Sequence, residues 1–359
     1  MKHDLQKIFS EFLIYGDFVQ AAPYGSGHIN DTYAVVVNQG GTHVRYLAQR
    51  INHLIFKNPP ALMDNISRVT SHLRMKISDS DDSSRRVLSL IPTKDGKPFF
   101  KDDSGNYWRT YIFVEKAKSI DVIQTDDQAF QAARAFGRFQ KMLVDLPGAK
   151  LHETIPDFHN TPKRFANFEK ALSEDKCNRA KLAKKEIDFA LSRSSISGKL
   201  LELNSKGKIP ERVTHNDTKL NNVLIDDSTG EGICVIDLDT VMPGLALYDF
   251  GDLVRTSTSP AAEDEKDLSK VRMQMHMFKA LVNGYLEAAE DFLTKAEREN
   301  LAFSGKLITF EIGLRFLTDY LSGDVYFKTH REGHNLDRTR TQFKLVESIE
   351  EQEEEMNRL

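Results

Sequence analysis

The stretch from Val213 to Asn222 restricts this chain more than any other part of its sequence. It reads Val-Thr-His-Asn-Asp-Thr-Lys-Leu-Asn-Asn, and Val-Ile-Asp-Leu-Asp follows at 235–239. Asp217 therefore stands five residues before Asn222, and Asp237 follows on an apolar run typical of a strand. One carboxylate can accept the proton of an attacking hydroxyl, while an amide oxygen and a second carboxylate can hold Mg²⁺ on ATP. The spacing predicts a loop and a neighbouring strand that together support phosphoryl transfer.

Asp217 is the predicted base in this stretch. An isolated Asp could equally cap a turn, but Asn222 and Asp237 at the right spacing favour a catalytic role. Lys219 lies two residues further on, where it could neutralise charge on a transferred phosphoryl group or simply lie on the surface. Both interpretations of Lys219 stay open, whereas the His215 ring is expected to brace the loop by hydrogen bonding.

The predicted metal ligands are Asn222 and Asp237. Alternation along a strand would place Asp237 and Asp239 on one face. Because phosphate oxygens and water complete the shell of Mg²⁺, one or two protein carboxylates suffice. Asp239 is therefore expected either to add a second carboxylate ligand or to orient Thr240 and its loop.

Gly25, Ser26 and Gly27 form a turn between strand-like runs near the start of the chain. Glycine lets backbone N–H groups approach a phosphate closely, so this turn could cover the phosphates of ATP or merely join two strands. Arg50, at the end of a later strand-like run, is the candidate cation for those phosphates. Its neighbour Gln49 faces the other way, and the choice between the two stays open. No Walker A lysine motif is present, which disfavours a P-loop enzyme.

Composition and charge exclude several classes of protein. Of the 359 residues, 28% are charged and 40% hydrophobic, and the net charge is only −4, which disfavours nucleic acid as a partner. Cys177 and Cys234 form no CxxC motif, as is typical of a reduced cytosolic protein. The start of the chain lacks the pattern of a signal peptide, and no run approaches the ~20 apolar residues that span a bilayer. We therefore expect a cytoplasmic protein with small-molecule substrates and no nucleic-acid, membrane or obligate protein partner.

The pattern of elements changes near Glu115. Before it, strands are expected at 32–37, 44–51, 87–91 and 107–114, with helices at 5–12 and 59–75. After it, helices are expected at 129–146, 266–288, 296–321 and 342–358, with two more within 164–191 and short strands at 223–225 and 233–236. The sequence thus predicts an α+β fold with a small strand-rich N-lobe at 1–114, a crossing segment at 115–119 and a larger helical C-lobe at 120–359.

Taken together, these segments resemble the aminoglycoside phosphotransferase and choline kinase branch of the protein-kinase-like fold. The order His-x-Asp-x-x-x-x-Asn from 215, Ile-Asp-x-Asp from 236 and Tyr-Asp-Phe-Gly-Asp from 248 is the order of that branch. Five segments, at 24–30, 214–222, 236–244, 315–321 and 334–342, look like those of the N-acetylhexosamine 1-kinases, and the likeness runs over nearly the whole chain. The resemblance implies the bilobal fold of the branch. The third glycine of the protein-kinase loop is absent, with Asn30 at that distance.

This resemblance also implies an activity. It implies ATP-dependent phosphorylation of N-acetylglucosamine or N-acetylgalactosamine at the anomeric O1, giving the α-1-phosphate and ADP by direct in-line transfer, with Mg²⁺ as cofactor. Sugar contacts carried over by motif fall on His28, Asp217, Thr240, Arg315 and Tyr326. Asp249 and Asp252 are expected as structural caps near the site. The two amino sugars differ only at the C4 hydroxyl, and the sequence does not choose between them.

Two alternatives remain. A kinase of the same fold could act on another small alcohol, such as homoserine, choline or an aminoglycoside. The charges between Arg315 and Arg340 are mixed, which favours a neutral sugar over a polycation. A non-catalytic nucleotide-binding module could lack Asp217, Asn222 or Asp237, but this chain has all three.

Overall fold

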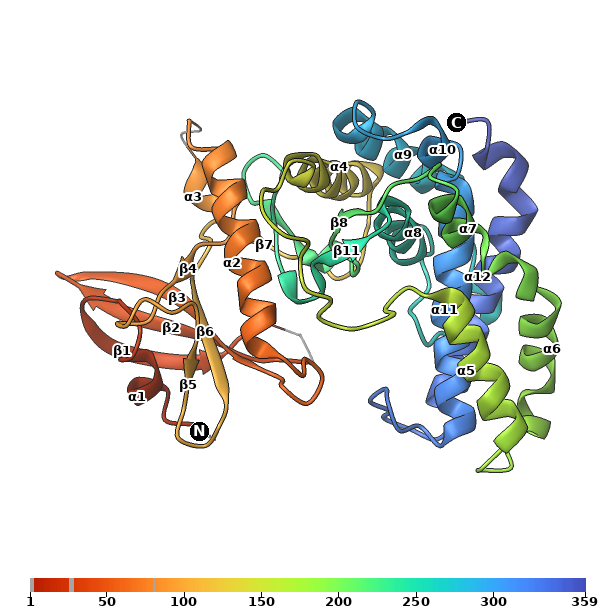
Figure 1. Cartoon of the computed structure of the whole chain (residues 1–359), viewed down its shortest axis with the longest axis horizontal. Helices are drawn as coiled ribbons and strands as arrows, with labels where there is room; N and C mark the ends of the chain where they lie inside the picture. Colours follow the sequence, from red (N-terminus) through yellow and green to blue (C-terminus); the bar gives the residue numbers. More distant parts are fainter. Residues whose placement is uncertain (1–2, 26–28, 80–81) are drawn as a thin grey trace.

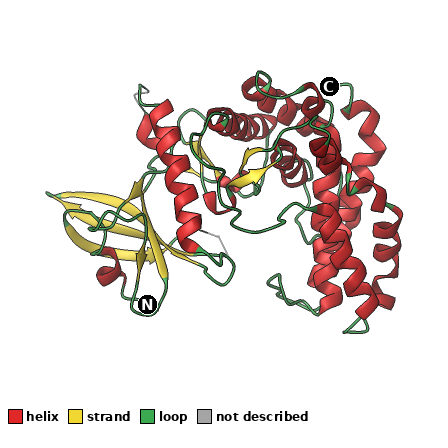
Figure 2. Cartoon of the chain, in the orientation of Figure 1, coloured by secondary structure: helices red, strands yellow, loops and turns green. Residues whose placement is uncertain are grey.

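The computed structural model describes residues 3–25, 29–79 and 82–359. Strands gather in one region and helices dominate the other, as Figure 2 shows, so the predicted α+β class is confirmed. A six-stranded antiparallel sheet makes up most of the first region (Figure 1). It runs in the order β1 (Asp17–Pro23), β2 (Asp31–Gln39), β3 (Thr42–Ile51), β6 (Tyr107–Ile112) and β4 (Leu90–Ile91), with β5 (Phe100–Lys101) also paired to β6.

The two faces of this sheet are covered by different helices. The β2–β3 hairpin turns at Gly40 and Gly41, whose positive φ values of 62° and 93° suit a tight turn. On one face, Phe9 of α1 (Leu5–Phe9) packs with Tyr46 and Ala48 of β3. On the other face lies α2 (Pro59–Lys76), which begins with the Asn58 side chain accepting a hydrogen bond from the Ala61 N–H.

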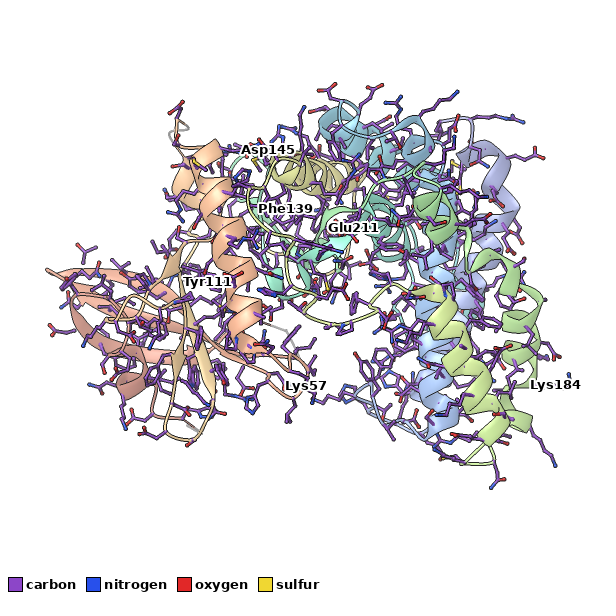
Figure 3. The ribbon with its side chains drawn as sticks, viewed as in Figure 1. Lys57, Tyr111, Phe139, Asp145, Lys184 and Glu211 are labelled. Atoms are coloured by element: carbon purple, nitrogen blue, oxygen red, sulfur yellow. The ribbon has the colours of Figure 1, made fainter. Side chains whose placement is uncertain are left out.

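A hydrophobic cluster on the α2 face joins the sheet to the rest of the molecule. It contains Leu47 and Tyr111 from the sheet, Leu62 from α2, Phe139 from α4 (Asp126–Leu143) and Leu238 from the predicted metal-binding segment. Figure 3 labels two of its members, Tyr111 and Phe139. Burial of this cluster fixes the position of the sheet relative to the segment that follows Asp237.

Two small sheets support the predicted catalytic segments at the middle of the molecule (Figure 1). In the first, β9 (Val223–Asp226) lies between β10 (Gly232–Val235) and β7 (Ala117–Lys118). In the second, β8 (Arg212–Thr214) pairs with β11 (Met242–Gly244). The segment at 115–119 carries β7 and so leads from the larger sheet to these smaller ones, while the exact lobe boundaries stay a prediction.

The remaining helices form the second region, in which α4 packs against α9 and α11 against α5, α8 and α12. They are α5 (Thr161–Glu174), α6 (Lys184–Ser192), α7 (Lys199–Ser205), α8 (Ala246–Ser257), α9 (Met275–Ala289), α10 (Lys295–Arg298), α11 (Leu301–Ser322) and α12 (His334–Met356). The short α3 (Ser83–Arg86) lies outside this region, beside α2 (Figure 1), and contacts β10. In the described part of the chain, none of the helices combines the length and apolar character needed to cross a membrane.

Several predicted helix ends differ from the structure. The helix expected at 266–288 begins only at Met275, because the Asp267 side chain accepts hydrogen bonds from Ser269 and closes a local turn instead. The helix expected at 296–321 is divided between α10 and α11 near Asn300, whose side chain donates to the Ala296 carbonyl oxygen. Only Leu90 and Ile91 of the strand expected at 87–91 are extended in the sheet.

Candidate functional site

The pairing of β8 with β11 brings the two predicted catalytic segments together. Thr214 lies opposite Met242, so the loop after β8, with Asp217, and the loop before β11, with Asp237, leave the same short sheet. Thr240 strengthens the link, because its hydroxyl donates to the His215 carbonyl oxygen at 2.7 Å. The residues that spacing alone suggested are therefore neighbours in the fold.

Asp249 on α8 anchors the backbone of the Asp217 loop. Its buried carboxylate accepts hydrogen bonds from the backbone N–H groups of His215 at 2.9 Å and Asn216 at 2.7 Å. Its carbonyl oxygen accepts a bond from the Thr218 hydroxyl at 2.6 Å. These bonds hold Asn216 at a φ of 65°, an uncommon conformation for a residue other than glycine. The structure thus gives Asp249 the supporting role expected for it.

The His215 ring braces both loops, as expected. Its Nδ1 accepts a hydrogen bond from the Asp217 N–H at 3.3 Å, so Nε2 carries the proton. That proton is donated to the Ile236 carbonyl oxygen at 2.9 Å. One ring therefore fixes the residue before Asp237 relative to Asp217.

The Asp217 carboxylate lies between two side chains of its own loop. Lys219 Nζ is 3.1 Å from Oδ2, and Asn222 Nδ2 donates to the same oxygen at 3.2 Å. Burial raises the pKa of Asp217, but Lys219 together with His215 and Arg255 outweighs it, so the pKa lies below its ordinary value. Asp217 in turn raises the pKa of Lys219. At neutral pH the site thus holds an ionised carboxylate, which can accept a hydrogen bond from a hydroxyl.

Asp237 has the properties expected of a metal-binding carboxylate. It is accessible to solvent, and within the described residues its carboxylate makes no hydrogen bond or ion pair. Desolvation by surrounding protein atoms, together with the carboxylates of Asp239 and Asp217, raises the pKa of Asp237 to about 6. A positive ion beside Asp237 would relieve this repulsion.

Asn222 completes a donor set that suits Mg²⁺. Its Nδ2 donates to the Asp217 carbonyl oxygen at 2.8 Å, which turns its amide oxygen to the opposite side of the group. Amide and carboxylate oxygens are ligands that Mg²⁺ accepts, with phosphate oxygens and water at its other positions. No group of three or more His, Cys, Asp or Glu side chains arranged for a metal occurs among the described residues, so the fit requires phosphate oxygens.

Asp239 does not share the surroundings of Asp237. Asp237 has a φ of 57° and lies beyond the end of β10, so strand alternation does not apply to the two residues. Asp239 is buried and forms an ion pair with Arg109 of β6, and it accepts a hydrogen bond from Asn30 Nδ2 at 2.6 Å. Both of its oxygens therefore have protein partners.

The structure does not bring Arg50 to these carboxylates. Arg50 Nε donates to Asp31 Oδ2 at 2.6 Å, and alternation along β3 places it on the α1 face with Ala48. Gln49 lies on the opposite face, where its Oε1 accepts a hydrogen bond from Arg109 Nε at 3.0 Å. Of the glycine turn, Gly25 has a φ of 80°, while Ser26, Gly27 and His28 lie outside the described residues.

The predicted sugar contacts late in the chain form a cluster of rings around Arg315 on α11. The Arg315 guanidinium lies 5.3 Å from the ring centre of Phe158, 6.0 Å from that of Tyr326 and 5.6 Å from that of Phe327. It makes no hydrogen bond or ion pair with any other part of the chain that the structure describes. Tyr326 is 61% exposed. Both side chains are therefore available to a ligand.

A buried pair that sequence reasoning missed connects Arg315 to the Asp217 loop. His159 Nε2 bonds the Asn216 carbonyl oxygen at 3.1 Å, and its Nδ1 lies 2.8 Å from Glu311 Oε1. Glu311 stands one turn before Arg315 on α11. Because both ring nitrogens face acceptors, both must donate, and the imidazole is protonated. Burial lowers the pKa of His159, but Glu311 outweighs it and the pKa is raised.

Comparisons with known proteins concern the family and the fold of this chain. A sequence model of the phosphotransferase enzyme family matches residues 20–272. Among solved structures, an aminoglycoside phosphotransferase from Alicyclobacillus acidocaldarius is 13% identical with a TM-score of 0.65, over 99% of this chain and 96% of that one. A spectinomycin phosphotransferase in complex with ADP and spectinomycin is 14% identical with a TM-score of 0.56, over 93% and 91%.

A third structure extends the comparison to another acceptor. Plasmodium vivax ethanolamine kinase is 13% identical to this chain with a TM-score of 0.54, over 90% of this chain and 81% of that one. At such identities the likeness concerns the fold. The three structures confirm the predicted protein-kinase-like fold class.

Proposed function

Because this chain belongs to the phosphotransferase enzyme family, we propose that it transfers the γ-phosphoryl group of ATP to the anomeric O1 of an N-acetylhexosamine. The products are an N-acetyl-α-D-hexosamine 1-phosphate and ADP. The observation that carries the chemistry is the position of ionised Asp217 beside Lys219 and Asn222, with accessible Asp237 on the neighbouring loop. The choice of sugar rests on the resemblance of five sequence segments to the N-acetylhexosamine 1-kinases.

Asp217 acts as the base in this proposal. It accepts a hydrogen bond from the anomeric hydroxyl, which is more acidic than the other hydroxyls of a sugar. The hydroxyl oxygen forms a bond to the γ-phosphorus as the bond to the bridging oxygen of ADP breaks, and the hydroxyl proton passes to Asp217. The rate then depends on positioning, which the bonds from Asp249 and His215 provide before substrate binds.

Lys219, Asn222 and Asp237 handle negative charge. The Lys219 ammonium, already beside Asp217, can neutralise charge on the transferred group. Asn222 and Asp237 would hold Mg²⁺, which supplies charge neutralisation at the β- and γ-phosphate oxygens. On the nucleotide side, Gly25, Ser26 and Gly27 remain the residues proposed to cover the phosphates.

The acceptor is proposed to lie between the Asp217 loop and α11. Thr240 donates its own proton to His215, so its hydroxyl oxygen can only accept a bond from a sugar hydroxyl. Arg315 offers a fork of donors among aromatic rings that suit a sugar face. His28 and Tyr326 complete the proposed contacts.

The fold neighbours keep one alternative open, a kinase of the same fold that phosphorylates a different alcohol. Aminoglycosides and ethanolamine are cationic, and a cationic acceptor needs carboxylates near its site. Here a second guanidinium lies close to Arg315: burial and Arg315 lower the pKa of Arg164, which donates to the Phe158 carbonyl oxygen at 2.9 Å. Two guanidiniums beside Phe158 favour a neutral acceptor with carbonyl or hydroxyl oxygens.

A coupled ADP-release assay tests this proposal. The panel contains N-acetylglucosamine, N-acetylgalactosamine, glucosamine, choline, ethanolamine, homoserine and an aminoglycoside, with Asp217→Asn as the blank. We expect turnover with at least one N-acetylhexosamine and background rates with the cationic alcohols. Turnover with a cationic alcohol alone would support the alternative, and no acceptor-dependent ADP release from any member would refute both.

A further inference from the structure

The register of the six-stranded sheet places Arg109, a cation that the sequence did not single out, on the face of the sheet that packs against α2. Gln49 of β3 lies directly opposite Arg109 of β6, and Leu47 lies opposite Tyr111 on the same face. Leu47 and Tyr111 pack with α2, so Gln49 and Arg109 also point to that face. Arg109 is therefore a cation of strand β6 on the same side of the sheet as the loop that carries Asp237, which we call the metal loop.

Arg109 is held on both sides of its guanidinium. It is 1% exposed, its Nη1 forms an ion pair with the Asp239 carboxylate, and its Nε donates to Gln49. Gln49 Nε2 in turn donates to the Thr32 hydroxyl at 3.0 Å on β2. The charge of Arg109 is thus held in a fixed place by residues of β2, β3 and the loop that carries Asp239.

Asp239 receives a second bond from the segment that follows the glycine turn. Asn30 Nδ2 donates to Asp239 Oδ2 at 2.6 Å, and Asn30 Oδ1 accepts a bond from the Asn52 N–H at 2.9 Å. We name the set Asn30, Arg109 and Asp239 the Asp239 tie. It joins residues separated by 209 and 130 positions in the sequence. It is the point at which the residue before β2, strand β6 and the loop that carries Asp237 meet.

The Asp239 tie has a direct consequence for Asp237. Asp237 is two residues earlier, in a left-handed conformation, and is followed by a single turn of 3-10 helix at 238–240. Because this segment is short and tightly turned, any shift of Asp239 also shifts Asp237. The partners of Asp239 therefore set where the accessible carboxylate of Asp237 stands relative to the strands.

We propose that Arg109 is a positioning residue for phosphoryl transfer, which acts by holding Asp239 and thereby fixes Asp237 where the metal–nucleotide complex needs it. Asp239 is then a partner of Arg109 and not a ligand of the metal. The inference rests on the proposed function to the extent that it requires the protein to bind Mg·ATP. In this proposal the Arg109–Asp239 pair connects β6 to the metal loop.

Calorimetry of ADP binding, with Mg²⁺ and with EDTA, tests this inference on the variants Arg109→Gln, Asp239→Asn and Asn30→Ala. Residues that orient metal ligands typically contribute about 10–100-fold to metal affinity or activity. We expect Arg109→Gln and Asp239→Asn each to reduce the Mg²⁺-dependent gain in ADP affinity within that range and to raise the KM for ATP. ADP affinity in EDTA should change little. The double variant should lose little more than either single one, because both remove the same ion pair.

The Asn30→Ala variant removes the Asn30 bond to Asp239 but leaves the Arg109–Asp239 ion pair, so it should show the same loss in weaker form. Asn30→Ala leaves the buried charges unchanged, so it remains informative if the loss of a buried charge prevents folding. Arg109→Lys also keeps the charge and should recover part of the Mg²⁺ response. Arg193→Gln is the matched control, since it breaks an Arg–Glu pair with Glu350 on remote helices. It should lower the melting temperature without changing the Mg²⁺ response.

Two outcomes would overturn the inference. Loss of the Mg²⁺ response in Asp239→Asn with a normal response in Arg109→Gln would make Asp239 a metal ligand in its own right. A lower melting temperature with an unchanged Mg²⁺ response in every variant would make the tie merely structural. If the unaltered protein binds no Mg·ADP, the proposed function fails and this inference with it.

Discussion

The loops around Asp217 and the cluster around Arg315 are held in opposite ways. The backbone of the Asp217 loop is fixed by buried hydrogen bonds from Asp249 and by the His215 ring. The Arg315 guanidinium lies among aromatic rings and makes no hydrogen bond or ion pair within the described residues, and Tyr326 is mostly exposed. A group that acts in the transition state must be positioned before the substrate arrives, whereas a group that selects the substrate must be left without a protein partner. The difference identifies which residues should affect turnover and which should affect recognition.

The largest effect should come from Asp237→Ala, which removes the proposed metal carboxylate. We expect no measurable turnover and weaker Mg²⁺-dependent binding of ATP, because charge on the β- and γ-oxygens is no longer neutralised. Calorimetry with Mg·ATP provides the readout. Asp227→Ala is the control, since the Asp227 side chain is half exposed and, within the described residues, forms its ion pair with Lys118 alone. An unchanged affinity for Mg·ATP would show that Asp237 is not a metal ligand.

Asp217→Asn should lower kcat by about 10²–10⁴-fold, the usual contribution of a positioned acid–base group. The amide keeps the shape of the side chain but cannot accept the proton of the acceptor hydroxyl. Mg·ATP should still bind, so the loss appears in kcat and not in nucleotide affinity. Steady-state kinetics decide the point, and near-normal turnover would show that Asp217 is not the base.

The variant Glu311→Gln tests the buried His159–Glu311 pair, which connects α11 to the Asp217 loop, through its effect on protein stability. Removing one partner of a buried ion pair costs about 3–5 kcal/mol of unfolding free energy. Glu311 outweighs burial and raises the pKa of His159 above its ordinary 6.5. The stabilisation that protonated His159 gives the folded state is therefore complete below pH 6.5 and is lost as the pH rises through the folded-state pKa. Burial raises the pKa of Glu311, but His159 outweighs it and the pKa lies below 4.5, so its contribution is lost only at lower pH.

The difference in stability between the unaltered protein and Glu311→Gln should therefore be greatest between pH 4.5 and 6.5 and shrink above that range. Urea unfolding at several pH values measures it. An equal difference at every pH would mean that His159 is not protonated in the folded protein, and the proposed connection would then be an ordinary hydrogen bond.

Arg315→Ala should have the smallest of these effects and the most selective. Loss of one charge-assisted hydrogen bond to the sugar is worth about 1.5–3 kcal/mol, or roughly ten- to a hundred-fold in kcat/KM. The KM for ATP should stay the same, and Arg315→Lys should recover part of the loss. A variant that changes ATP and sugar kinetics equally would place Arg315 among the residues that support the catalytic loop.

The sequence predicted the residues that depend on local spacing. Asp217, Lys219 and Asn222 lie within one short loop, so their contact follows from the chain itself. The strands of the β2–β3 hairpin and the helix that begins at Pro59 were predicted for the same reason, because strand alternation and proline at a helix start act over a few residues.

Sequence reasoning missed the residues whose partners are far along the chain. Arg109 reads as one strand residue among many until the register of β3 and β6 and its pair with Asp239 are known. The His159–Glu311 pair joins residues 152 positions apart. The sequence leaves the choice between Arg50 and Gln49 open, and alternation along β3 directs Arg50 to the α1 face. Tertiary packing, which spacing does not encode, decides these cases.

The central claim is that the γ-phosphoryl group of ATP goes to the anomeric oxygen of an N-acetylhexosamine. Phosphorus NMR of the product formed from ATP and N-acetylglucosamine, and likewise from N-acetylgalactosamine, tests it most directly. We predict a phosphomonoester signal coupled to the anomeric proton, in the α configuration, and its absence with Asp217→Asn. A 6-phosphate, or no product from either amino sugar, would contradict the account.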